Sequence, residues 1–164
     1  MTNDLPLDVT PIRRVIIDHA LASGLFDAVG GHEPKRAPGT GLTAAVWVQT
    51  LDTVQSSGLA STTARLVFQG RIYTSMTREP QDDIDPVMTN AAAAWIGALV
   101  GDLKLKGPDP EPGAVGLIRT IDVRGSNGIP LTGQAGYIEQ DGKLFRVYTI
   151  TVPCLVNDVW EEAQ

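Results

Sequence analysis

The sequence predicts an α+β fold, in which a mostly antiparallel sheet of about five strands has two main helices packed on one face. Two segments carry apolar residues at helical spacing, and several runs rich in Val, Thr and aromatic residues have the composition of strands. The strands follow one another through hairpin-type turns, which is typical of antiparallel sheets with helices on one side. The length of 164 residues fits a single domain, residues 1–164, with terminal extensions at 1–9 and 154–164.

The first helix is predicted at residues 10–31, TPIRRVIIDHALASGLFDAVGG. Thr10 suits the N-cap, Pro11 suits the first helical position, and a Gly30-Gly31 pair suits the end. The apolar residues at helical spacing are Ile12, Val15, Ile16, Ala20, Leu21 and Leu25. The HEPKRAPGTG segment that follows has the Pro and Gly content of a loop.

Two strands are predicted next, at residues 42–54 and 61–76, with a loop or wide hairpin tip between them. The second is the clearer one, because its residues alternate in character. Ala64, Leu66, Phe68 and Ile72 share one side, and Arg65, Gln69, Arg71 and Tyr73 take alternate positions on the other. This pattern predicts one buried face and one solvated face, as in an antiparallel sheet.

The second helix is predicted at residues 86–103, where Asp85 and Pro86 form an N-cap and first-turn pair. Its expected apolar face consists of Val87, Ala91, Ala94, Trp95 and Ala98. A Pro- and Gly-rich loop follows, including GPDPEPG at Gly107 to Gly113, and then a strand at 115–125. Residues 134–152 predict a hairpin around Asp141-Gly142, and Pro153 is expected to end its last strand.

The bulk composition narrows the possible functions. A net charge of −6 does not favour attraction to a phosphate backbone. The single cysteine excludes an internal disulfide framework and a multi-cysteine zinc site. No secretory signal opens the chain, and the weakly polar run at 91–100 is about half of what a bilayer span needs. We expect an intracellularly made protein with no membrane partner.

The acidic stretch REPQDDIDPVM, residues 78–88, decides between an enzyme and a structural protein. Asp82, Asp83 and Asp85 precede the second helix, where the helix dipole and capping favour carboxylates. No apolar setting that would separate their pKa values is evident, and no catalytic triad order involves His19 or His32. We therefore predict helix capping, no catalytic, cofactor or metal site, and no enzyme activity. A small metal-dependent hydrolase built on these aspartates remains the alternative from a different class.

Arginines at strand positions are the candidates for an interaction surface. Arg65, Arg71, Arg119 and Arg146 either line a solvated sheet face or pair with acids of a neighbouring copy, because Arg is favoured at interfaces. Trp160 near the C-terminus either packs on its own domain or anchors a partner. Both pairs of alternatives stay open at the level of the sequence.

Three stretches resemble the tail terminator proteins of long-tailed bacteriophages of the siphovirus type, especially those that infect actinobacteria. They are GLTAAVWVQTLDTVQSSGLASTTARLVFQGRIYTSMTREPQDDIDPVM, LTGQAGYIEQDGKLFRVYTITVP and VNDVW. The similarity spans roughly residues 34–160 and lies in the order of the segments and in their local sequence, with no catalytic signature. The GPDPEPG insert departs from the pattern.

The resemblance implies a homohexameric ring in the neck of the virion, assembled in the host cytoplasm. Such a ring ends polymerisation of the tail tube protein, meets the head-tail connector or stopper protein, and lets genomic DNA pass without sequence-specific binding. The loop residues Ser56, Ser57, Gly58 and Leu59 and the arginine-bearing faces are then the expected interfaces. Six chains at −6 would carry roughly −36, so we hypothesise a negative lumen that repels DNA. Another neck, connector or tail completion protein is the alternative within the same setting.

Overall fold

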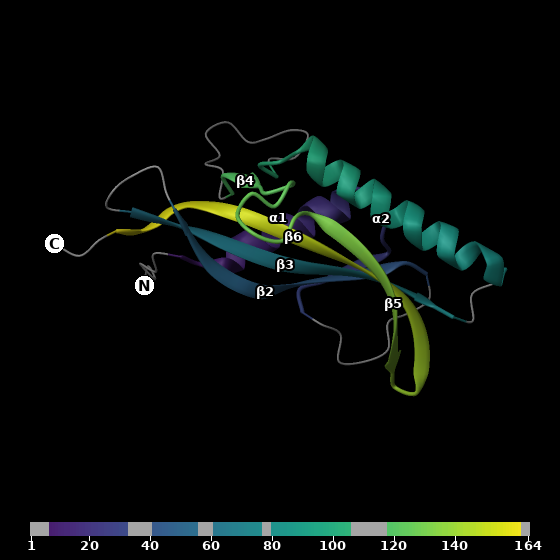
Figure 1. Cartoon of the computed structure of the whole chain (residues 1–164). Helices are drawn as coiled ribbons and strands as arrows, with labels where there is room; N and C mark the ends of the chain where they lie inside the picture. The colour runs from purple at the N-terminus through teal and green to yellow at the C-terminus, as the bar shows by residue number, and fades with distance from the viewer. Residues whose placement is uncertain (1–6, 33–40, 56–60, 77–79, 106–117, 162–164) are drawn as a thin grey trace.

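The computed structural model describes residues 7–32, 41–55, 61–76, 80–105 and 118–161. The fold is α+β, as predicted, with two helices and a curled, mostly antiparallel sheet (Figure 1). The elements are α1 Val9–Ala22, β1 Ala28–Gly30, β2 Thr43–Gln55, β3 Ser61–Ser75, the short 3-10 helix η1 Gln81–Asp83, α2 Ile84–Gly101, β4 Thr120–Ile121, β5 Thr132–Gln140 and β6 Lys143–Glu161. No helix within these ranges is both long and apolar enough to cross a membrane.

The sheet has six strands in the order β1-β2-β3-β6, and both β4 and β5 then pair with β6. Neighbours are antiparallel except for β1 and β2, which are parallel. The long central strands β3 and β6 pair along almost their whole length, with a register shift between Thr62 and Ala64. The sixth strand, β1, comes from residues expected to be helical.

Helix α1 differs from its predicted limits at both ends. Asp8 is the N-cap, because its carboxylate accepts a hydrogen bond from the backbone N–H of Thr10 at 3.0 Å. Pro11 is therefore the third residue of the helix, still within the first turn, where its missing N–H would have no partner anyway. The helix ends at Ala22, not at Gly30-Gly31, because Gly24 adopts a φ of +72° that stops helical winding.

Helix α2 also begins earlier than predicted, at Ile84, after the turn of η1. Asp85 is inside the first turn and is not the N-cap, and Asp83 at the cap position makes no side-chain capping bond. The N-cap is therefore Asp83 rather than Asp85, and all three aspartates lie around the positive end of the helix. The buried face consists of Ile84, Met88, Ala91, Ala92, Trp95 and Leu99. Ala94 of the expected face is exposed.

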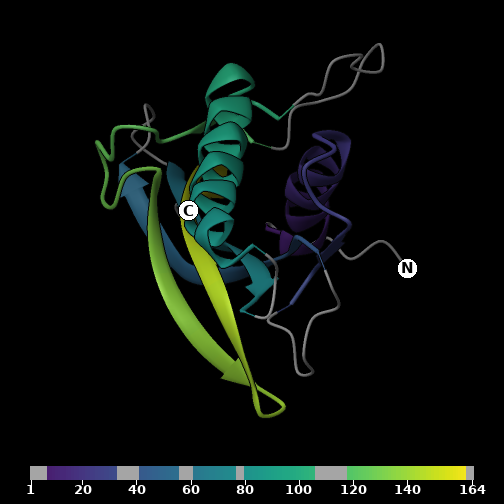
Figure 2. The same ribbon diagram turned by 90° about the vertical axis from the view of Figure 1, so that its right-hand side faces the viewer.

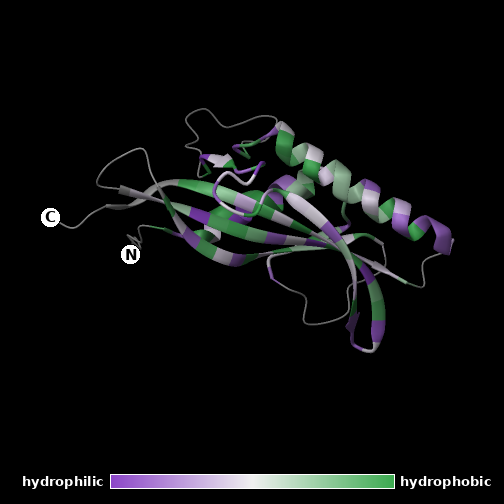
Figure 3. Cartoon of the chain, in the orientation of Figure 1, coloured by the Kyte–Doolittle hydropathy of each residue, from purple (hydrophilic) through white to green (hydrophobic). Residues whose placement is uncertain are grey.

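Both helices lie on the same side of the sheet (Figure 2). Their buried residues form one core with Ala64, Leu66, Phe68 and Ile72 of β3, the side predicted to be buried. Hydrophobic and hydrophilic residues alternate along the strands, which directs one set of side chains into this core (Figure 3). The sequence pattern therefore predicted correctly which side of β3 meets the helices.

The opposite side of β3 is not the solvated face that the alternation predicted. Arg65, Gln69 and Tyr73 are all buried. Tyr73 packs with Ala45, Phe145 and Val147 in a second, smaller core on this side, which Trp47 and Ile138 border. Pairing of β6 with β3 accounts for much of this cluster, because Val147 lies opposite Tyr73 and Phe145 lies opposite Ser75.

The C-terminal half of β6 corrects two expectations. The hairpin around Asp141 and Gly142 is confirmed, and both residues have the positive φ of a type I′ turn. Pro153 does not end the strand, however, and residues 154–161 are part of the sheet rather than an extension. The carbonyl of Pro153 accepts from Asp122 N at 2.8 Å, so its nitrogen also faces the gap between β4 and β5 and costs no bond to β3.

Candidate interaction surface

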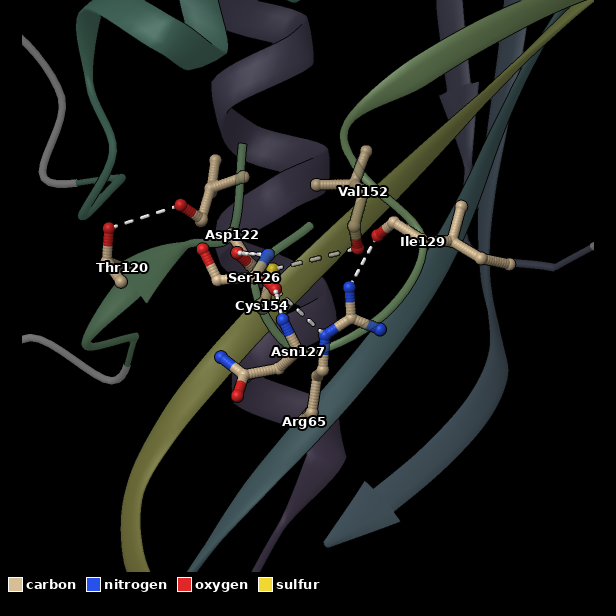
Figure 4. Close-up of polar contacts among 9 residues, drawn as sticks. Arg65, Thr120, Asp122, Ser126, Asn127, Ile129, Val152 and Cys154 are labelled. Atoms are coloured by element: carbon tan, nitrogen blue, oxygen red, sulfur yellow. Dashed lines mark hydrogen bonds and ion pairs between the residues drawn. The ribbon is translucent and has the colours of Figure 1, made fainter. Parts of the chain in front are cut away.

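Arg65 projects from β3 on the side without helices and is 2% exposed. Its Nε donates to Oδ2 of Asp122 at 3.2 Å, which makes a buried ion pair (Figure 4). Asp122 also accepts hydrogen bonds from the backbone N–H groups of Ser126 at 3.0 Å and Asn127 at 3.1 Å. The carboxylate therefore joins the central strand β3 to the loop that leads from β4 to β5.

The same guanidinium fixes the far side of this loop. Arg65 Nη2 donates to the carbonyl oxygen of Ile129, and a side chain at Gly128 would collide with the guanidinium. Arg65 is therefore buried and engaged within its own chain, and it does not lie on a solvated sheet face. Its contacts hold the loop between β4 and β5 in place, and Ile129 on this loop is 57% exposed.

Arg71 and Arg146 are also held by groups of their own chain. Arg71 lies over the ring of Trp47 at 5.2 Å and donates to the hydroxyl of Thr149 at 3.0 Å. Arg146 pairs with Asp85 at 2.9 Å and lies over the ring of Tyr137 at 4.3 Å. The sequence alternative of pairing with acids of another copy is therefore not needed for Arg146, because Asp85 supplies the acid.

Arg119 is the one of the four arginines that is exposed. Its backbone N–H donates to Leu155 O at 2.8 Å, beside the short strand β4. The remaining predicted contact residues, Ser56 to Leu59, lie outside the described residues, as does the Gly107 to Gly113 loop. Trp160 belongs to β6, but its side chain lies outside the described part of the chain.

The acids that could have formed a metal site are dispersed. Asp82 and Asp83 are exposed in η1, and Asp85 turns toward Arg146. Among the described residues, no three His, Cys, Asp or Glu side chains are grouped so that they could hold a metal ion. Cys154 is fully buried between β3 and β4, and burial raises the pKa of its thiol to about 12, so it is no nucleophile in the folded chain.

An open pocket of about 630 Å³ lies beside the first turns of α1. Its two arginines are already engaged: Arg13 donates to Gly31 O at 2.9 Å, and Arg14 pairs with Asp18 at 3.5 Å. The pocket is lined by Asp8, Thr10, Pro11, Arg13, Arg14, Ile17, Val29 and Gly31. With its cations paired to carbonyl and carboxylate oxygens, the pocket offers little to bind an anionic ligand.

The two borders of the sheet are the more informative surface. Within the described residues, β1 covers β2 only at Thr43 to Ala45, so residues 46–55 have one unpaired edge. At the opposite border, β5 pairs with β6 alone. Large apolar side chains are exposed on both: Val48 at 36%, Leu51 at 53% and Tyr137 at 57%.

Sequence reasoning missed these border residues, although a signal was present. Strands β2 and β5 contain no Lys, Arg or Pro, which often protect a sheet border, although β2 has a register shift between Val48 and Thr50 and each strand carries one acid. No protein-family model matches the chain, and none of the curated proteins matches it either. The chemistry that this surface can perform is main-chain hydrogen bonding to a further strand, combined with apolar contact.

Proposed function

We propose that this chain is a structural virion protein that forms a ring of six copies, ends polymerisation of a phage tail tube and joins the tail to the head connector. The resemblance of its strand and helix segments to tail terminator proteins suggests the role. The observation that carries it is the pair of sheet borders at β2 and β5, which lack a strand partner within the described residues and contain no Lys, Arg or Pro. A border of that kind invites another strand, so a chain that keeps two of them is suited to assembly.

A ring follows from two different borders more readily than a dimer does. When one patch of a subunit binds a different patch of the next, the contact repeats until the rotation closes it. In a closed ring, each of these borders is paired with a border of a neighbouring copy. The finished ring then has no border left to add a further copy in the same plane.

DNA would pass through this ring without specific contacts. The chain carries a net charge of −6, which gives the assembly a repulsive rather than an attractive field for phosphates. On the side of the sheet without helices, the cations Arg65 and Arg71 have partners within the chain, namely Asp122, Trp47 and Thr149. Because both guanidinium groups already have these partners, neither is positioned to bind phosphate.

The test is assembly of the phage particle without this chain, followed by electron microscopy. Overlong tails beside DNA-filled heads would support the proposal, because tube growth would have lost its stop. Tails of normal length detached from heads would assign the chain to the connector instead. Intact infectious particles would remove it from the tail. Native mass spectrometry of the purified chain gives an independent check, with a species of six times the 17.5 kDa chain expected.

A further inference from the structure

We infer that neighbouring copies join by sheet extension, with the free edge of β2 in one copy pairing antiparallel with the free edge of β5 in the next. This inference rests on the proposed ring and names its interface. The occupant of each border is a second copy of the same chain. Residues 46–55 and the strand Thr132–Gln140 are similar in length, so one can pair with the other along most of its extent.

The strand directions fit this pairing. β2 is antiparallel to β3, β3 is antiparallel to β6, and β6 is antiparallel to β5. β2 and β5 therefore run in opposite directions at the two borders. A copy that adds its β2 beside the β5 of its neighbour continues the alternation, and it leaves its own β5 free for the next copy.

The side chains of the two borders match in the layer to which they point. Val48 and Leu51 lie opposite Phe68 and Leu66, so they project on the helix side of the sheet. Tyr137 lies opposite Arg146, which reaches Asp85 of α2 on that same side. A continued sheet therefore brings three exposed apolar side chains together in one layer, where their mutual burial favours association.

Charge opposes the contact only weakly, because the two acids involved, Asp52 and Glu139, lie on opposite faces of the sheet. Residues 46–55 contain one acid, Asp52, and β5 contains one acid, Glu139, with no base in either segment. Asp52 and Leu51 are adjacent in β2 and therefore point to opposite faces. Placing Leu51 near Tyr137 of the next copy thus leaves Asp52 on the other face of the sheet, away from the apolar contact.

Pairing of β2 with β2 across a two-fold axis is the competing geometry. It would also be antiparallel, but it would close after two copies and leave both β5 borders unpaired. The absence of Lys, Arg and Pro from β5 as well as from β2 argues against it, because an edge that stays free is normally protected. The head-to-tail contact uses both borders at once.

Two measurements test the inference on the full-length chain. In the first, Leu51→Lys places a charge at the β2 border, and Val100→Lys adds the same charge at an exposed apolar site on α2. Sedimentation should show self-association weakened at least about tenfold by Leu51→Lys and unchanged by Val100→Lys, with both variants melting close to the parent. A Leu51→Lys chain that still forms the parental ring would overturn the β2 contact while leaving the ring intact.

In the second measurement, a Leu51→Cys chain and a Tyr137→Cys chain are mixed and treated with a short bismaleimide. Native Cys154 is fully buried and does not compete. Head-to-tail pairing predicts a Leu51→Cys to Tyr137→Cys cross-link and few links between identical variants. Links only between two Leu51→Cys chains would replace it with the two-fold geometry. A parental chain that stays monomeric at every concentration would overturn both this inference and the proposed ring.

Discussion

At the scale of single residues, the main surprise is a charge placed inside a sheet. An arginine that alternates with apolar residues is usually a marker of a solvated face, yet Arg65 is buried and paired. Burial of an ion pair is tolerated only when the remaining donors and acceptors are satisfied. Here two backbone N–H groups and the carbonyl of Ile129 complete the network.

Breaking this pair should strongly destabilise the fold. We expect Arg65→Met to lower the free energy of unfolding by about 3–5 kcal/mol, because Asp122 would remain as a buried charge that has lost its cation. Arg14→Met is the matched control, since its pair with Asp18 is exposed, and it should cost less than about 1 kcal/mol. Urea denaturation at neutral pH measures both. Equal, small losses would show that the buried pair contributes no more than a surface pair.

His19 should make stability depend on pH. Burial lowers the pKa of His19 below its usual value of 6.5, against the opposing effect of the Asp102 carboxylate at 3.8 Å. The unfolded chain then binds a proton more readily than the folded chain, so the contribution of His19 decreases as pH falls through 6.5. Urea midpoints between pH 7.5 and 5.5 should fall less in His19→Gln than in the parent. Parallel pH profiles would rule out His19 as the cause.

At the scale of elements, α2 approaches the sheet closely because a glycine makes room for a tryptophan. Gly70 in the middle of β3 lies under the indole ring of Trp95, which is fully buried. The Trp95 ring also packs edge-on against the ring of Phe26, with their centroids 5.1 Å apart. A glycine normally weakens a strand, so its use here indicates close approach of a neighbouring element. The contact determines how near the helix layer lies to the sheet.

Two Gly→Ala substitutions separate this packing from backbone propensity. Gly70→Ala puts a methyl group into the space of the Trp95 ring and should destabilise the chain by about 1–3 kcal/mol through overpacking. Gly97→Ala on α2 meets nothing within 4 Å and should stabilise it by up to about 1 kcal/mol, because Ala favours helix. Thermal or urea unfolding reports both signs. A neutral Gly70→Ala would mean that the helix moves away from the sheet easily.

The elements also show how far local pattern reaches. Periodicity identified both helices, β2, β3 and the β5–β6 hairpin, because each depends on neighbours in the sequence. It missed the burial of the second face of β3, because that burial depends on β6 and on the loop after β4, which are distant from β3 in the sequence. The predicted end of β6 at Pro153 was also too early. Only the strand order shows that the nitrogen of Pro153 faces the gap between β4 and β5, where a missing N–H breaks no hydrogen bond of the sheet.

At the scale of the whole molecule, the central strands of the sheet are hydrogen-bonded on both sides, and the border strands mostly on one side. β3 and β6 are paired on both sides over most of their length, whereas β2 beyond Ala45 and all of β5 are paired on one side within the described chain. For this reason the lack of Lys, Arg and Pro in β2 and β5 was not enough to identify the candidate surface from the sequence. Val48, Leu51 and Tyr137 look like ordinary strand residues until the strand order places them at borders.

This difference between the central and the border strands predicts a change in amide hydrogen exchange when the chain assembles. In dilute monomer, amides of β3 and β6 should exchange slowest, and outward-facing amides in 46–55 and 132–140 should exchange quickly. Raising the concentration until rings form should slow exchange in both borders together, because sheet extension gives those N–H groups carbonyl partners. Exchange in α2 should change little and acts as the internal reference. Protection that appeared in β2 alone would indicate pairing of two identical borders, and protection confined to other segments would place the contact elsewhere.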